Sequence, residues 1–259
     1  MDSTSHPGPD GVYADDVTRM RVVGEPATAE TAAVMAVKRL DDAKSRLAAS
    51  RGPAHHAGHR GLVLAMMLDT VEAVSSAGIG RIVVVSPDAD VLAAARSAGA
   101  VGAQEIVAAD DASPADRLNL AFTHATAQVR AQWPSTTRVL LIQADLPAAT
   151  SQSLTSVIDA SRGHTEALLT DRDATGTTIL VRDVAVAHPP RFGPDSATAH
   201  RLAGAVELDP GHRHWADLRT DVDTAADLEA ARLLGLGRHT AASLGLRQAE
   251  SMRTTPDAS

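Results

Sequence analysis

The sequence contains no cysteine, few aromatic residues and almost no lysine. Without cysteine the chain cannot form disulfides, thiolate zinc sites, iron–sulfur clusters or a cysteine nucleophile. Its aromatic residues are two Phe, two Trp and one Tyr, too few for the stacking platforms that bind single-stranded nucleic acid. The net charge of -8 also disfavours sequence-independent binding to nucleic acid. We therefore expect no nucleic-acid partner.

Long apolar runs are also missing. None of the runs in the 259-residue chain is long enough to cross a bilayer, and the polar, acidic N-terminus lacks the apolar core of a signal peptide. These features predict a soluble, cytoplasmic protein with no membrane partner. Residues 1–29 and 241–259 are polar and without periodicity, which predicts a disordered N-terminal segment and a flexible C-terminal tail. Residues 30–240 are long enough for a single domain with its own core.

Within this domain, short apolar runs alternate with helical patterns. We expect strands at 31–37, 81–86, 104–108, 138–143, 166–170, 177–183 and 205–208, and helices at 61–78, 89–98, 114–130, 150–162, 195–203 and 224–235. The alternation predicts an α/β fold, with a mixed, mainly parallel sheet that helices cover on both faces. Ligands of such sheets bind beyond the carboxyl ends of the strands. We therefore expect the site in the segments that follow residues 37, 86, 143, 183 and 218.

Only two of the 24 basic residues are lysines, and both follow the first predicted strand. Lys38 and Lys44 share the segment AVKRLDDAKSRLA with Arg39 and Arg46. Compact ammonium groups suit phosphate oxygens, and four cations this close can neutralise a triphosphate. The glycine motifs of P-loops and dinucleotide folds are absent, and solvated charges at a helix start are the alternative. The position beyond a strand end favours binding of phosphates.

Three acidic residues also follow predicted strand ends or extended segments. Asp145 is the second residue after the strand at 138–143. Asp221 and Asp223 alternate in the segment RTDVDT, so on an extended chain both project to one face, where they repel each other unless a cation lies between them. Asp145 alone could equally be a turn residue. Together the three carboxylates suit one or two Mg²⁺ ions.

A second group of residues suggests a site for an anion. Gly176 and Thr177 directly precede a predicted strand, and HPPRFGPDSATAH combines a proline-restricted turn with a helix start. Gly193 allows close approach of the backbone to a ligand, and Asp195 or Ser196 would cap the helix, whose free amides favour an anion. A capped helix after a tight turn, without any ligand, is the alternative.

Five segments in this order resemble one enzyme family: AVKRLDDAKSRLA, LLIQADLP, DRDATGTTILVRD, HPPRFGPDS and LRTDVDTAADLEAARLLGLG. They are similar to the phospholactate and phosphoenolpyruvate guanylyltransferases of deazaflavin coenzyme F-420 biosynthesis, and most similar to the actinobacterial phosphoenolpyruvate form. The resemblance covers about residues 31–238, and RFGPDS together with DVDT is its specific part. It implies the Rossmann-like nucleotide-diphospho-sugar transferase fold. The implied reaction joins GTP to phosphoenolpyruvate or 2-phospholactate, releases pyrophosphate and, from phosphoenolpyruvate, gives enolpyruvyl-diphospho-guanosine.

The resemblance also implies roles for individual residues. The metal ligands for Mg²⁺ would be Asp145, Asp221 and Asp223; the phosphorylated three-carbon acid would be held by Thr177, Gly193 and Ser196; the catalytic basic residues near the GTP phosphates would be Lys38, Lys44 and Arg46; and Asn119 would contact the nucleotide along with both lysines. Two features depart from the family pattern: Ala144 stands where the family usually has glycine, and residues 109–117 lack its usual glycine. The product could be handed to the next enzyme of the pathway.

The implied chemistry agrees with the residues present. A phosphate oxygen is already an ionised nucleophile, so no general base is needed, and the difficulty is to bring two polyanions together. Two alternatives remain: another Mg²⁺-dependent nucleotidyltransferase of this fold, with 3-phosphoglycerate, a molybdopterin or a sugar phosphate as acceptor, and a nucleotide binder without activity. The RFGPDS segment disfavours the first alternative, and the paired carboxylates disfavour the second.

Overall fold

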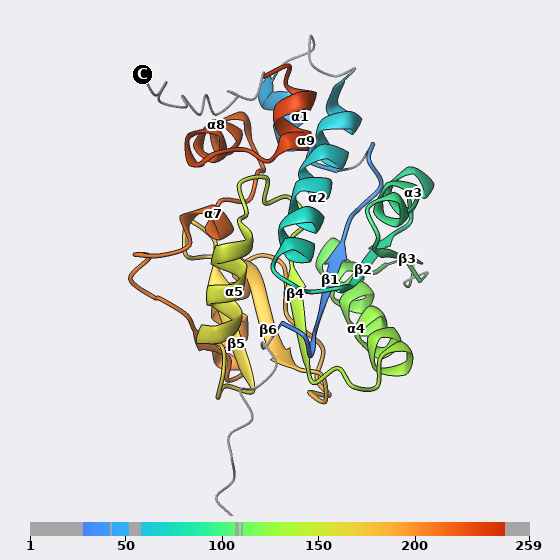
Figure 1. The fold of residues 1–259 in the computed structure, drawn as a ribbon, viewed down its shortest axis with the longest axis vertical. Helices are drawn as coiled ribbons and strands as arrows, with labels where there is room; N and C mark the ends of the chain where they lie inside the picture. The colour runs from blue at the N-terminus through green and yellow to red at the C-terminus, as the bar shows by residue number, and fades with distance from the viewer. Residues whose placement is uncertain (1–27, 42, 52–57, 107–108, 110, 247–259) are drawn as a thin grey trace, which may run out of the picture.

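The computed structural model describes residues 28–41, 43–51, 58–106, 109 and 111–246 as a sheet between layers of helices (Figure 1). The strands of the described residues are β1 (Thr31–Ala36), β2 (Arg81–Ser86), β3 (Val101–Gln104), β4 (Arg138–Ile142), β5 (Glu166–Thr170), β6 (Thr177–Asp183) and β7 (Val206–Glu207). The helices are α1 (Ser45–Arg51), α2 (His59–Ser76), α3 (Ala89–Ser97), α4 (Pro114–Gln132), α5 (Ser151–Ala160), α6 (Ser196–Leu202), α7 (Ala216–Arg219), α8 (Ala225–Leu234) and α9 (Arg238–Ser243).

The sheet has the order β3-β2-β1-β4-β6-β5-β7. Strands β3, β2, β1 and β4 pair in parallel, whereas β6 is antiparallel to both of its neighbours. The central strand β1 is in register with both sides, since Val34 lies opposite Val83 of β2 and Leu141 of β4. The predicted mixed, mainly parallel sheet is confirmed.

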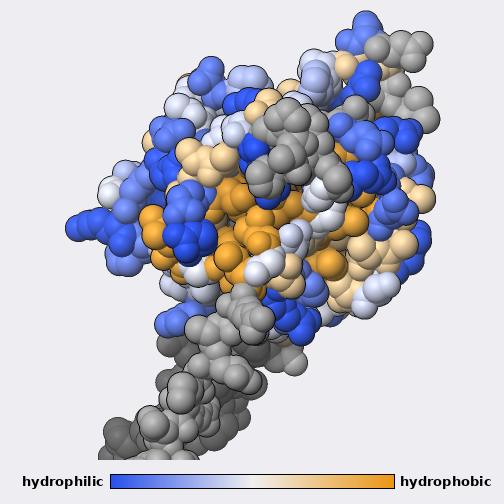
Figure 2. Space-filling model, turned by 90° about the horizontal axis from the view of Figure 1, so that it is seen from above, coloured by the Kyte–Doolittle hydropathy of each residue, from blue (hydrophilic) through white to orange (hydrophobic). Residues whose placement is uncertain are grey.

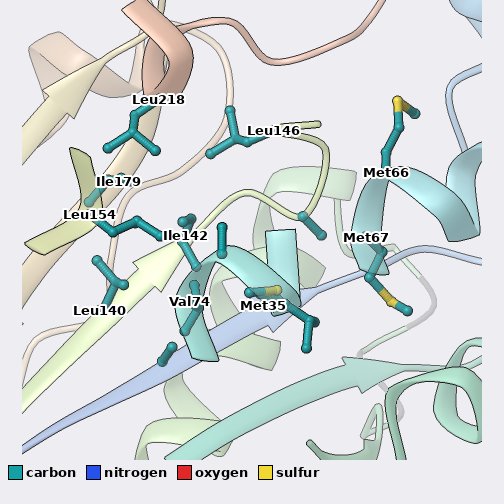
Figure 3. Packing of buried hydrophobic residues seen from close by; sticks show 14 of the residues in the cluster. Met35, Met66, Met67, Val74, Leu140, Ile142, Leu146, Leu154, Ile179 and Leu218 are labelled. Carbon is teal, nitrogen blue, oxygen red and sulfur yellow. The ribbon is translucent and has the colours of Figure 1, made fainter. Parts of the chain in front are cut away.

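Alternation along the central strands divides the core into two layers. Met35 of β1 faces the helices α2 and α5 and packs in one cluster with Met66 and Leu154 (Figure 3). The neighbouring Val34 faces the opposite side and packs with Phe122 of α4. Successive strand side chains point to opposite faces, so apolar residues at consecutive positions require helices on both sides, as the sequence predicts.

The third strand lies earlier in the chain than predicted. The expected strand at 104–108 is wrong, because β3 spans Val101–Gln104; residues 107 and 108 lie outside the described residues. A Cβ at Gly102 would be 3.0 Å from the carbonyl oxygen of Leu92 in α3. The glycine that suggests a loop in the sequence therefore serves to let α3 pack closely on the strand.

The direction of β6 corrects another expectation. Because β6 runs against its neighbours, its first residue, Thr177, lies at the edge where β1, β2 and β4 end, and Asp183 lies at the opposite edge. The prediction of site residues directly after 183 is therefore wrong. The pairing of β5 with β6 also shifts by one residue at Leu169 and Thr170, which forms a β-bulge beside Thr177.

Three short helices were not predicted. Helix α1 lies in the basic segment after β1, where a helix start was only the alternative interpretation. Helix α7 occupies the place of an expected strand end at 218, and α9 extends past residue 240, where the domain was expected to end. Asp69 of α2 holds the start of α9, because its carboxylate accepts hydrogen bonds from the amides of His239 (2.9 Å) and Thr240 (2.8 Å). The domain boundaries stay predictions, since most of both terminal segments lies outside the described residues. In the described part of the chain, no helix has the length and apolarity required to span a membrane.

Candidate active site

A cavity of about 1200 Å³ opens where β1, β2 and β4 end and β6 begins. Figure 2 views this end of the molecule from above and shows hydrophobic side chains gathered near the centre, with hydrophilic side chains around them. The cavity brings together nearly all of the predicted site residues: Lys38, Lys44, Arg46, Asp145, Thr177, Gly193, Ser196, Asp221 and Asp223. Asn119 is absent from the lining.

Three carboxylates meet on one side of the cavity. Oxygen atoms of Asp145, Asp221 and Asp223 lie within 4.8 Å of one another. Asp145 follows β4, and its carbonyl oxygen accepts a hydrogen bond of 3.1 Å from the amide of Val222. This bond holds the extended segment with Asp221 and Asp223 alongside Asp145. The alternation of the two acids and the position of Asp145 therefore lead to the predicted cluster.

Two basic side chains from the segment after β1 reach the same carboxylates. Lys44 forms ion pairs with Asp145 and, at 2.7 Å, with Asp223. Arg46 pairs with the other oxygen of Asp223 from a far more exposed position, since 72% of its side chain is accessible against 19% for Lys44. Lys44 adopts a left-handed backbone with φ of 55° at the entry to α1. The unpredicted helix α1 thus helps to direct both cations at the acids.

Burial and charge move the pKa values of two of these acids in opposite directions. Burial raises the pKa of Asp221 to about 6, against the attraction of Lys44 and with added repulsion from Asp223 and Asp171. For Asp223, burial also favours the neutral form, but Lys44 and Arg46 outweigh it and lower its pKa. Burial therefore dominates at Asp221, whereas the two basic side chains dominate at Asp223.

The carboxylate cluster fits a divalent metal ion. Asp145 is buried, and its oxygen Oδ1 has no hydrogen-bond partner among the described residues. A buried, unpartnered carboxylate oxygen is costly unless a cation or donor approaches it, and hard divalent cations prefer such oxygen ligands. A second group of potential ligands, Asp69, Glu72 and His239, does not share this feature, because both oxygens of Asp69 accept amide hydrogens of α9.

The turn between β5 and β6 forms another part of the cavity lining. The carboxylate of Asp171 accepts hydrogen bonds from the amides of Thr175 (3.0 Å) and Gly176 (2.8 Å). It lies so close to Gly176 that any Cβ there would collide with it. Asp171 was not predicted, although it directly follows a strand at the expected edge of the sheet. Its position after β5 is the signal that could have identified it.

The RFGPDS segment lines the cavity beside α4 and leads into α6. Gly193 has φ of 129°, and a Cβ there would lie 2.8 Å from Cβ of Ala115 in α4. The close approach that Gly193 permits is therefore between the RFGPDS segment and helix α4. The amides of Ser196 and Ala197 at the start of α6 already donate to the carbonyl oxygens of Gly193 and Thr175. These two amides are therefore not free to bind the anion that was predicted at the start of this helix.

Asn119 anchors the RFGPDS segment from α4. Its side-chain nitrogen donates to the carbonyl oxygen of Phe192 (2.9 Å), and its side-chain oxygen accepts the amide of the same residue (2.8 Å). These two bonds fix the backbone beside Gly193. The predicted contact between Asn119 and the nucleotide stays a prediction, and the structure gives this residue a supporting position behind the wall.

Ala144 replaces the glycine that is usual in the family. It lines the cavity without a positive φ, so its backbone does not require glycine.

His200 of α6 is buried behind Thr177, and its Nδ1 atom lies 3.0 Å from the threonine hydroxyl. His200 was not predicted, although it is four residues after Ser196 and therefore on the same helix face.

Comparisons with known proteins identify the family of this chain. Residues 31–209 match the sequence model of the family described as guanylyl transferase CofC like. The chain is 45% identical over 223 residues to the phosphoenolpyruvate guanylyltransferase of Mycobacterium sp. (strain KMS), covering 85% of this chain and 94% of the relative. It is 47% identical over 214 residues to the enzyme of the same name from Nocardia farcinica (strain IFM 10152), covering 82% and 89%.

Solved structures share the fold at low sequence identity. A nucleotidyl transferase from Methanothermobacter thermautotroptrophicus has a TM-score of 0.53 at 16% identity, covering 79% of this chain and 97% of that one. A protein from Desulfovibrio desulfuricans G20, described as a putative nucleotide-diphospho-sugar transferase, has a TM-score of 0.51 at 13% identity, covering 80% and 96%. The fold is therefore that of nucleotide-diphospho-sugar transferases, and the chain belongs to the CofC-like guanylyltransferase family.

Proposed function

We propose that this protein joins the guanylyl group of GTP to phosphoenolpyruvate and releases pyrophosphate, as a step of coenzyme F-420 biosynthesis. The observation that carries the proposal is the cavity itself. Three carboxylates, two lysines, Thr177 and Ser196 all line it, in a chain whose relatives at 45–47% identity are named for this reaction.

The reaction forms one bond and breaks one bond. A phosphate oxygen of phosphoenolpyruvate attacks the α-phosphorus of GTP, and the bond from that phosphorus to the oxygen bridging to the β-phosphate breaks. The electron pair leaves with pyrophosphate. Because the attacking oxygen is already ionised, the protein needs to position two anions and to offset their charge, without removing a proton.

The carboxylate side of the cavity would hold the divalent cation, for which we propose Mg²⁺. Asp145, Asp221 and Asp223 would be its protein ligands, and the unpartnered Oδ1 of Asp145 supplies an oxygen of the type that Mg²⁺ prefers. When bound, Mg²⁺ would stabilise negative charge on the phosphates of the nucleotide. Lys44 now neutralises two of these acids, and its ammonium group would be released toward the triphosphate.

The segment after β1 would bind the phosphates of GTP. Lys38 is exposed at the cavity wall, and Lys44 and Arg46 lie beside the carboxylates. These three are our candidates for the catalytic cations that align the triphosphate and offset charge on the leaving pyrophosphate. The opposite wall, with Thr177, Gly193 and Ser196, would bind the phosphorylated three-carbon acid.

The test is pyrophosphate release from the purified protein with GTP and Mg²⁺. Phosphoenolpyruvate, 2-phospholactate and 3-phosphoglycerate are offered separately and then in competition, and mass spectrometry of the product identifies the acid that was joined. We expect enolpyruvyl-diphospho-guanosine. Absence of pyrophosphate with all three acids would refute the proposal, and a product from another acid would reassign the acceptor. A cytoplasmic location and transfer of the product to the next enzyme stay predictions.

A further inference from the structure

His200 is buried directly behind the wall that we assign to the acid. Only 2% of the residue is exposed, and it is absent from the residues that line the cavity. Its ring contacts the ring of Phe192 edge-on, with 5.1 Å between ring centroids. The imidazole therefore cannot touch a ligand and can act only through the groups next to it.

The hydrogen bonds of the imidazole determine which nitrogen carries the proton. The backbone amide of Arg191 donates to Nε2 over 2.9 Å. A backbone amide can only donate, so Nε2 must be the unprotonated nitrogen, and a neutral imidazole then carries its hydrogen on Nδ1. The clamp of Asn119 on Phe192 fixes the adjoining backbone and so keeps the Arg191 amide directed at the ring.

The surroundings of the ring keep it neutral. Burial, together with the nearby charges of Arg182 and Arg191 and with His188, lowers the pKa of His200 to about 4. At neutral pH the ring is therefore uncharged, and Nδ1 donates its single hydrogen to the hydroxyl oxygen of Thr177, 3.0 Å away.

This arrangement decides what the hydroxyl of Thr177 can do. A threonine hydroxyl has one hydrogen to donate, and His200 leaves that hydrogen unused because it is itself the donor. Thr177 lines the cavity, and His200 is the one hydrogen-bond partner of its hydroxyl among the described residues. The hydroxyl hydrogen is thus available to an acceptor on the cavity side, and an anion supplies such an acceptor.

We propose that His200 is a positioning residue that makes Thr177 a dedicated hydrogen-bond donor to the anionic acid, through the chain Arg191 amide, His200 and Thr177. This inference rests on the proposed function, because it takes the acid as the ligand of Thr177. Hydrogen bonds linked in one direction polarise one another. His200 thereby selects an acceptor at this wall, which suits a phosphate or carboxylate and disfavours a ligand group that can only donate.

Two substitutions separate this role from a merely structural one. In His200→Asn the side-chain amide lies near the position of Nδ1 and can still donate to Thr177, whereas in His200→Gln it reaches the position of Nε2 and can still accept from Arg191. We expect His200→Gln to raise the KM for phosphoenolpyruvate between about 10- and 100-fold, as for a lost hydrogen bond to a charged group. His200→Asn should keep this KM within about threefold, and the KM for GTP should change in neither variant.

If His200 only supports the structure, the order of the two KM changes is reversed. His200→Gln is then the milder change, because it still accepts from the Arg191 amide and keeps the RFGPDS segment attached. That order, or an equal rise in the KM for GTP, would overturn the inference. If the variants fail to fold, NMR of the ring nitrogens in the wild-type protein decides: a proton on Nδ1 supports the inference and a proton on Nε2 refutes it. Wild-type protein that releases no pyrophosphate would instead refute the proposed function, so the two failures are distinguishable.

Discussion

The two walls of the cavity solve the problem of binding anions in different ways. The wall with Asp145 and Lys44 is built from full charges that pair with one another. At the wall with Thr177, the hydroxyl and the imidazole of His200 behind it are neutral groups whose hydrogen bonds run in a fixed direction. Burial acts on both walls, since it raises the pKa of Asp221 to about 6 and lowers that of His200 to about 4.

The difference indicates which wall must rearrange. Ion pairs with Lys44 and Arg46 already engage Asp145 and Asp223 in the charged wall, so a metal ion or a triphosphate has to replace contacts that already exist. The neutral wall keeps its contacts, and only the hydrogen of Thr177 gains a new partner. We therefore expect substitutions in the charged wall to affect catalysis most, and substitutions in the neutral wall to affect stability and the binding of one substrate.

The largest effect should come from Asp145→Asn. The amide lowers the charge of the cluster and offers one ligand oxygen in place of two, so kcat/KM should fall by more than about 100-fold, the upper range for residues that only support a metal ligand. The assay is pyrophosphate release at several Mg²⁺ concentrations. Asp173→Asn, an exposed acid on the same cavity, is the matched control. Equal losses in both variants would contradict a metal site at Asp145.

The next effect concerns the pH dependence of stability. The pKa of His200 is about 4 in the folded protein against 6.5 unfolded, so between these values the unfolded chain binds more protons, and stability falls as the pH is lowered from about 6.5 to 4. At about 1.36 kcal/mol per pKa unit the loss does not exceed roughly 3–4 kcal/mol. Urea unfolding of the wild type and of His200→Gln across this range measures it. Parallel pH profiles of the two proteins would show that His200 is not responsible.

A smaller effect, on the free energy of unfolding, should distinguish Lys44 from Arg46 in the charged wall. Lys44→Met leaves Asp145 and Asp223 without their shared partner, and we expect a loss of about 2 kcal/mol, below the range for fully buried pairs. Mg²⁺ should restore much of this stability. Arg46→Met removes the more exposed partner of Asp223 and should cost less than about 1 kcal/mol. Unfolding in EDTA and in Mg²⁺ tests both, and equal losses without metal would contradict the comparison.

The last prediction concerns the glycine of the neutral wall. Gly193→Ala introduces a methyl group 2.8 Å from Cβ of Ala115 at φ of 129°, so we expect a loss of about 1–3 kcal/mol from strain and overpacking. Gly204→Ala has a similar positive φ with open space around it and isolates the backbone strain. If both variants unfold at the same denaturant concentration, the contact with Ala115 contributes nothing.

The sequence predicted the charged wall better than the neutral one. Asp221 and Asp223 alternate, and Asp145 follows a buried strand, so local pattern and sheet topology suffice to bring them together. The roles of Asn119 and His200 depend on contacts between α4, the RFGPDS segment and α6, which no local pattern encodes. The third strand was misplaced because Gly102 indicates a loop unless the packing of α3 is known.

The bulge beside Thr177 has a consequence for the whole strand. Strict alternation would place Thr177 on the same face as Ile179, which packs with the α2 and α5 layer, yet the Thr177 hydroxyl meets His200 of α6 on the other side. The register shift at Leu169 and Thr170 offsets this alternation, since a bulge redirects the side chain next to it. A single strand can therefore fill one hydrophobic layer and still aim its first hydroxyl toward the opposite helix.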